Sequence, residues 1–70
     1  MVLPQHRKLI VSLLVASYQL RMTDPAAAES AFRDARRELV KANVSRAEAR
    51  EIVEEARIKA EGDRAGIRRA

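Results

Sequence analysis

Proline and glycine occur at only four positions in this chain of 70 residues, and their placement constrains the fold more than any other feature. The prolines are Pro4 and Pro25, and the glycines are Gly62 and Gly66. Because these two residue types interrupt helices most strongly, they leave long stretches between them unbroken. With a turn at residues 43–45, they divide the chain into three segments. None of these segments shows the strict alternation of apolar and polar residues that is typical of strands, so we predict an all-α fold, a small three-helix bundle.

Capping residues mark the ends of the three predicted helices. Asp24 can accept hydrogen bonds from exposed backbone N–H groups, and Pro25 suits the first helical position, where its missing N–H has no consequence. Ser45 and Glu48 have the spacing of a capping box, which starts the third helix. Gly62 suits a position just after the end of that helix. The predicted helices span about residues 5–22, 25–42 and 46–61.

Chain length and composition predict one small domain over residues 1–62, followed by a basic, flexible tail over residues 63–70. Hydrophobic residues make up 47% of the chain, which is too many for a disordered segment of low hydropathy. The large aliphatic side chains are concentrated in the first helix, whereas the second and third offer narrow, alanine-rich faces. This distribution suits a central helix that is covered on more than one side.

The first helix carries more apolar surface than two alanine-rich helices can cover, and we therefore expect it to associate. A core of this size contributes only about 3–5 kcal/mol of net stability, and oligomerisation often supplements it. The chain would form a helical homodimer or dock onto a larger protein through this helix. A monomeric bundle with a few exposed aliphatic side chains is the alternative. The predicted anchors are Leu9, Leu13, Leu14, Tyr18 and Leu20.

Positive charge is concentrated at the two ends of the chain. The 14 lysines and arginines exceed the 10 acidic residues by four. Residues 1–22 contribute a net +3 and residues 62–70 a net +2, while the segment between them sums to −1. The net charge of +4 therefore does not indicate a basic surface on the second or third helix. Any basic surface there depends on how individual cations are arranged along each helix.

The second helix carries a line of cations. Arg33, Arg37 and Lys41 recur one helical turn apart, with Arg36 beside them. We expect this line to contact an acidic protein surface or phosphate groups. The alternative is an ordinary solvated face, neutralised in part by neighbouring carboxylates.

Residues 39–52 loosely resemble a helix-turn-helix, with a short turn followed by a second helix that starts at Arg46. Base contacts would come from Arg46 and Arg50, near the start of that helix. The third helix also carries four glutamates between residues 48 and 55, which would repel phosphates. A dimeric DNA-binding transcriptional regulator is therefore the alternative function. The basic tail would add phosphate contacts from Arg64, Arg68 and Arg69.

Residues that commonly carry chemistry are sparse. The chain has no cysteine and a single histidine, His6, which excludes thiolate sites and multi-histidine metal sites within one chain. We expect His6 to be an exposed terminal side chain, and we predict no enzymatic activity, no cofactor and no metal. One tyrosine and one phenylalanine do not make an aromatic platform for stacking single-stranded bases.

The apolar run at residues 9–20 is shorter than the roughly 20 residues that a transmembrane helix needs. The same run after Arg7 and Lys8, followed by small residues at 15–17, is also compatible with a cleaved signal peptide. We expect a cytoplasmic protein that keeps this segment, because its removal would leave the other helices little to pack against. The sequence as a whole favours a small, non-enzymatic helical module for protein–protein interaction or regulation.

Overall fold

The computed structural model describes residues 3–69, and it describes side chains for residues 3–62. The described part of the chain contains three α-helices and no strand. This confirms the predicted all-α fold with three helices. The first two helices begin and end within two residues of their predicted limits. The helices are α1 (Pro4–Leu20), α2 (Pro25–Lys41) and α3 (Arg46–Arg69).

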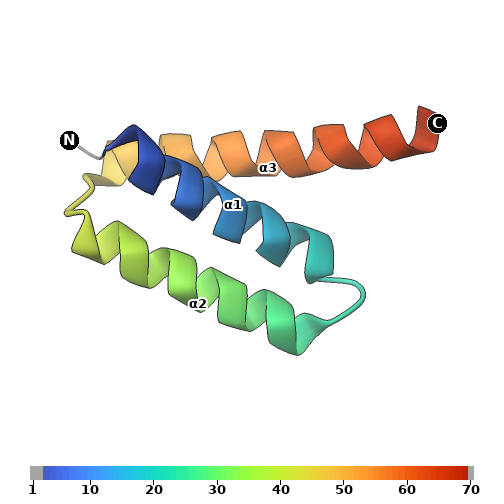
Figure 1. Cartoon of the computed structure of the whole chain (residues 1–70), viewed down its shortest axis with the longest axis horizontal. Coiled ribbons are helices and arrows are strands. Elements are labelled where there is room, and N and C mark those ends of the chain that lie inside the picture. Colours follow the sequence, from blue (N-terminus) through green and yellow to red (C-terminus); the bar gives the residue numbers. More distant parts are fainter. Residues whose placement is uncertain (1–2, 70) are drawn as a thin grey trace.

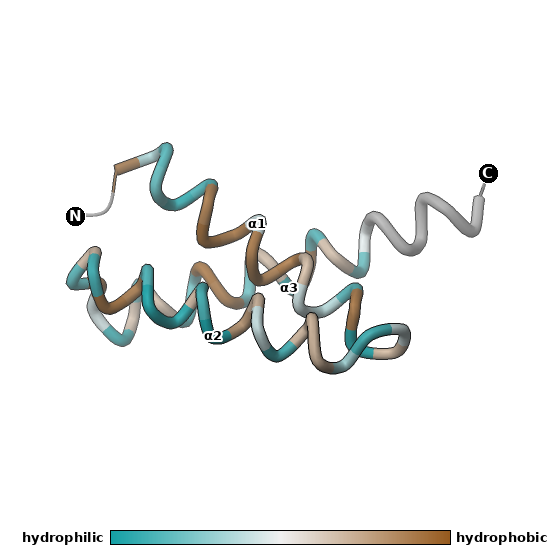
Figure 2. Tube along the Cα trace, turned by 60° about the horizontal axis from the view of Figure 1, so that its bottom comes forward, coloured by the Kyte–Doolittle hydropathy of each residue, from teal (hydrophilic) through white to brown (hydrophobic). Residues whose placement is uncertain are grey.

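The apolar helix α1 lies between the other two, which barely touch each other (Figure 1). Figure 2 shows hydrophobic residues concentrated along α1. The alanines of α2 and α3 leave room for the larger side chains of α1 at the centre. Of the helices described, none combines the length and the hydropathy needed to cross a bilayer. The core consists of Ile10, Val11 and Leu14 from α1, Ala35 from α2, and Ile52 and Ala56 from α3.

Two predicted N-terminal caps are present. The Asp24 carboxylate accepts a hydrogen bond of 3.2 Å from the backbone N–H of Ala27, and Pro25 follows at the start of α2. The Ser45 hydroxyl accepts a hydrogen bond of 3.2 Å from the backbone N–H of Glu48, at the start of α3. Each of these bonds satisfies one of the four N–H groups that lack a partner within the helix.

The end of α2 is closed by a turn centred on Asn43, whose φ of 54° lies in the left-handed region. The backbone N–H of Val44 donates to the Leu39 carbonyl over 3.3 Å, and that of Asn43 donates to the Val40 carbonyl over 3.0 Å. These two bonds define a Schellman motif. Leu39 and Val44 both pack against the core, and they occupy the two positions that are usually hydrophobic in this motif.

The third helix is longer than predicted. Its backbone continues through Gly62 to Arg69, so the predicted end near residue 61, with Gly62 as the cap, is corrected. A glycine ends a helix when it adopts a positive φ, which Gly62 does not. Within a helix it costs only about 1 kcal/mol relative to alanine, so the chain can continue. The side chains of the predicted tail, residues 63–70, lie outside the described residues.

Candidate functional site

Most of the predicted anchors on α1 face inward. Leu14 is 1% exposed and belongs to the core, and Leu13 and Tyr18 are half-buried against it. Leu20 is also half-buried, whereas Leu9 is 49% exposed. Because α2 and α3 cover two sides of α1, Leu14 is a core residue, and the prediction that it anchors a partner is corrected. Leu9 is the predicted anchor that reaches furthest into solvent.

Exposed apolar side chains are spread over the molecule instead of gathering on α1. Val40 on α2 is 80% exposed and Ile58 on α3 is 59% exposed. Met22, in the turn after α1, is 85% exposed. Each of the three helices therefore presents at least one exposed apolar side chain beside its charged groups. The complete set of large exposed apolar residues described is Leu3, Leu9, Met22, Phe32, Val40 and Ile58.

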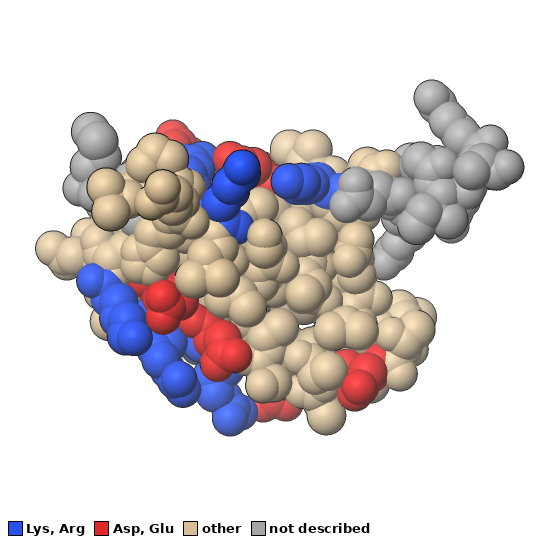
Figure 3. Space-filling view, viewed as in Figure 1, with Lys and Arg blue, Asp and Glu red and all other residues tan. Residues whose placement is uncertain are grey.

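The predicted line of cations lies on the outward side of α2. All of its members are exposed, and they lie opposite the alanines that face α1. Figure 3 shows lysine and arginine side chains grouped over this helix at the lower left of the molecule. We define the basic face of α2 by four exposed cations and the apolar residue among them: Arg33, Arg36, Arg37, Val40 and Lys41.

The cations of the basic face differ in their ionic partners. Arg33 lies 3.1 Å from the Glu29 carboxylate, and Lys41 lies 3.6 Å from that of Glu38. Among the side chains of residues 3–62, no carboxylate lies within 4.0 Å of the guanidinium groups of Arg36 or Arg37. Two uncompensated guanidinium groups therefore lie beside an exposed valine.

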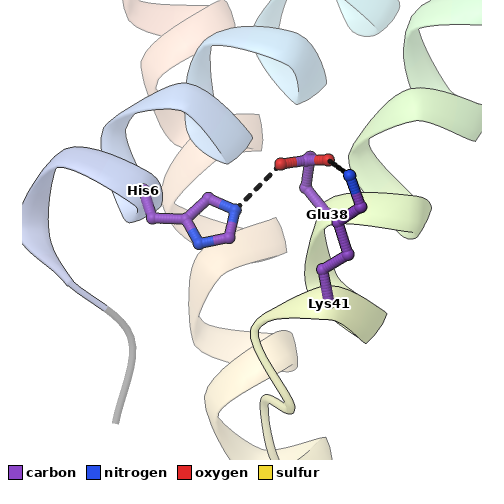
Figure 4. Close-up of polar contacts among 3 residues, drawn as sticks. All are labelled: His6, Glu38 and Lys41. Atoms are coloured by element: carbon purple, nitrogen blue, oxygen red, sulfur yellow. Dashed lines mark hydrogen bonds and ion pairs between the residues drawn. The ribbon is translucent and has the colours of Figure 1, made fainter.

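Glu38, which pairs with Lys41 of this face, also contacts α1 through a histidine that we expected to be exposed. The Nε2 atom of His6 lies 3.0 Å from Oε1 of Glu38, and Lys41 approaches the other carboxylate oxygen (Figure 4). The hydrogen bond with His6 lowers the pKa of Glu38, opposed by partial desolvation and aided by the Lys41 charge. The side chain of His6 is only 27% exposed, so the prediction of a free terminal side chain is wrong.

A second ion pair joins α1 to α3. The guanidinium of Arg7 donates a hydrogen bond of 2.8 Å to the Glu55 carboxylate. This bond is the main cause of a raised Arg7 pKa. Within α3, Arg57 hydrogen-bonds to Glu54 three residues earlier, as the spacing predicts. Sequence spacing can predict an ion pair within one helix, such as Arg57 with Glu54. It cannot predict the pair between Arg7 and Glu55, which are 48 residues apart.

The features behind the DNA-binding alternative are only partly brought together. Arg46 and Arg50 are exposed on α3, and Asn43 has the backbone conformation that glycine often supplies in such a turn. The helices on either side of the turn barely contact each other, because α1 lies between them. The side chains of the predicted phosphate contacts Arg64, Arg68 and Arg69 lie outside the described residues.

Comparison with known proteins yields no match: the chain fits no protein family, and neither a curated protein nor a solved structure is significantly similar to it.

Proposed function

We propose that this chain is a small, non-enzymatic helical module that binds an acidic surface of a larger protein through the basic face of α2. The observation that carries the proposal is the position of Arg36 and Arg37, which lack a carboxylate partner among the described side chains and lie on the same face as the exposed Val40. The buried apolar residues of α1 hold α2 and α3 in place, so the proposed partner contact lies on the outward side of α2.

The chemistry of this face suits carboxylates. A guanidinium group presents a planar set of N–H donors that pairs with a carboxylate through two parallel hydrogen bonds. An apolar side chain among such cations gains stability when a partner removes it from water, and apolar residues often form the centre of an interface. The uncompensated positive charge would also attract an acidic partner during encounter.

Two other functions serve as alternatives. In the first, the chain is a DNA-binding regulator that uses Arg46 and Arg50; the turn at Asn43 favours it, and the neighbouring glutamates of α3 oppose it. In the second, two copies of the chain associate through the edge of α1 at Leu9, which is 49% exposed.

Fluorescence anisotropy tests the proposal with two labelled probes: a helical peptide with glutamate at every fourth position, and a DNA duplex of about 20 base pairs. We expect the peptide to bind the wild-type chain. The double variant Arg36→Gln/Arg37→Gln should bind it roughly fivefold more weakly, because two exposed ion pairs contribute about 1 kcal/mol together.

Arg46→Gln/Arg50→Gln is the matched control, since it also removes two exposed arginines but from α3. It should leave peptide affinity unchanged. The proposal fails if this control weakens peptide binding as much as the α2 variant does. It also fails if the duplex binds more tightly than the peptide at about 0.15 M salt, where exposed charges are screened beyond about 8 Å.

A further inference from the structure

A second surface lies at the other end of α1, near the turn that leads into α2. Two depressions, of about 250 Å³ and about 230 Å³, occur there side by side. The first is formed between α1 and α3, and the second between α1 and α2. Arg21, the residue directly after α1, lines both of them.

The walls of these depressions are largely apolar. On the α3 side, Tyr18 and Met22 face Ala60, which is 5% exposed. On the α2 side, the lining includes Phe32, which is 41% exposed, and Ala28, which is 6% exposed. Met22 and Phe32 are themselves exposed, so each depression has one large apolar side chain that a ligand could cover.

Two arginines, Arg21 and Arg57, and two glutamates, Glu29 and Glu61, line these walls. Glu29 pairs with Arg33, and Arg57 pairs with Glu54 and Glu61. Arg21 has no carboxylate within 4.0 Å among the side chains of residues 3–62. Its guanidinium carbon lies 5.1 Å from the centre of the Tyr18 ring, which is the geometry of a cation–π contact.

Stacking on an aromatic ring fixes the plane of a guanidinium and leaves the N–H groups at its edge available to a carboxylate. We propose that this surface binds a peptide segment of a partner protein in which an acidic residue is flanked by apolar ones. The carboxylate would pair with Arg21, and an apolar side chain would enter each depression. This site is separate from the basic face of α2 and would add a second contact to the proposed module.

Amide chemical shifts of the ¹⁵N-labelled full chain test this proposal by titration with two short peptides. One has a glutamate between two leucines, and the other has glutamine in its place. We expect saturable shifts near Ser17, Met22, Phe32 and Ala60 with the first peptide. Affinity should fall at least about fivefold with the glutamine peptide, and by the same factor with Arg21→Gln, because both remove the charged pair.

Arg36→Gln/Arg37→Gln is the control that separates this site from the proposed function. If it leaves the shifts unchanged, the site at Arg21 stands whether or not the basic face binds a partner. Equal binding of the two peptides, or shifts confined to the basic face, overturns the proposal. So does unchanged peptide affinity in Arg21→Gln with a lowered unfolding midpoint, which would limit Arg21 to stabilising the end of α1. Binding of 3-phenylpropionate as tight as that of the peptide would assign the site to small organic acids instead.

Discussion

The imidazole of His6 and the carboxylate of Glu38 form a 3.0 Å hydrogen bond that joins the first turn of α1 to the last turn of α2. The next residue, Arg7, bonds to Glu55 of α3. Consecutive side chains therefore tie the central helix to both of its neighbours. Because α2 and α3 barely touch each other, their positions depend on α1. These two polar contacts and the apolar core around α1 therefore set the orientation of α2 and α3 relative to the central helix.

We expect stability to fall in acid partly through Glu38. Its pKa is lowered in the folded chain, chiefly by the hydrogen bond with His6, so the unfolded chain binds more protons at acidic pH. The stabilisation is therefore fully present above the ordinary value of 4.5 and is lost as pH falls through the folded pKa. Urea unfolding at pH 6, 4.5 and 3 should show a smaller loss in Glu38→Gln than in wild type. An identical loss in both proteins would show that the pair contributes nothing.

Glu54 provides the comparison for this experiment. Its pKa is also lowered, by the hydrogen bond with Arg57, but that pair lies within one helix. Glu54→Gln should likewise reduce the loss of stability in acid. Only Glu38→Gln should also change the amide chemical shifts of the first turn of α1, because only Glu38 contacts another helix there.

Two leucines of α1 should respond very differently to truncation. Leu14→Ala should cost about 2–5 kcal/mol of unfolding free energy, because it opens a cavity in the core. Leu9→Ala should cost less than about 1 kcal/mol, because its side chain is half in water already. Urea denaturation followed by circular dichroism measures both. Equal costs would mean that the core is not where the structure places it.

Substitution of Asn43 by glycine should preserve the stability of the fold, whereas substitution by a β-branched residue should lower it. At its φ of 54°, glycine has no steric penalty, so Asn43→Gly should leave stability unchanged or raise it. Asn43→Val should lower the unfolding free energy by about 1–2 kcal/mol, the cost of the left-handed conformation for such a residue. Thermal unfolding of the two variants checks this. A stable valine variant would argue against the Schellman turn.

Local features of the fold were predictable from the sequence. Asp24, Pro25 and Ser45 act within a few residues of their own positions, and the structure places them as helix starts. The alanine-rich faces of α2 and α3 also indicated correctly that a more apolar helix lies between them. The later end of α3 was missed because a single glycine does not oblige a helix to stop.

Features that depend on how the helices approach one another were not predictable. Leu9 and Leu14 are the same residue type on one apolar helix, and only the directions of α2 and α3 decide which is buried. His6 and Glu38 are 32 residues apart, so no spacing rule connects them. The cation line was visible in the sequence, and helical spacing allows Arg33 and Lys41 to pair with Glu29 and Glu38. That Arg36 and Arg37 have no carboxylate within 4.0 Å among the side chains of residues 3–62 emerged only from the structure.

Site-specific photo-crosslinking in cells of the native host tests the central claim most directly. A benzophenone-bearing residue is placed at Val40, which lies in the basic face, or at Leu9, on the exposed edge of α1. We predict that the Val40 position crosslinks to one discrete larger protein, that nuclease treatment leaves this product unchanged, and that Arg36→Gln/Arg37→Gln removes it. A crosslink that forms only from Leu9, yields a dimer of this chain or disappears after nuclease treatment would contradict the account.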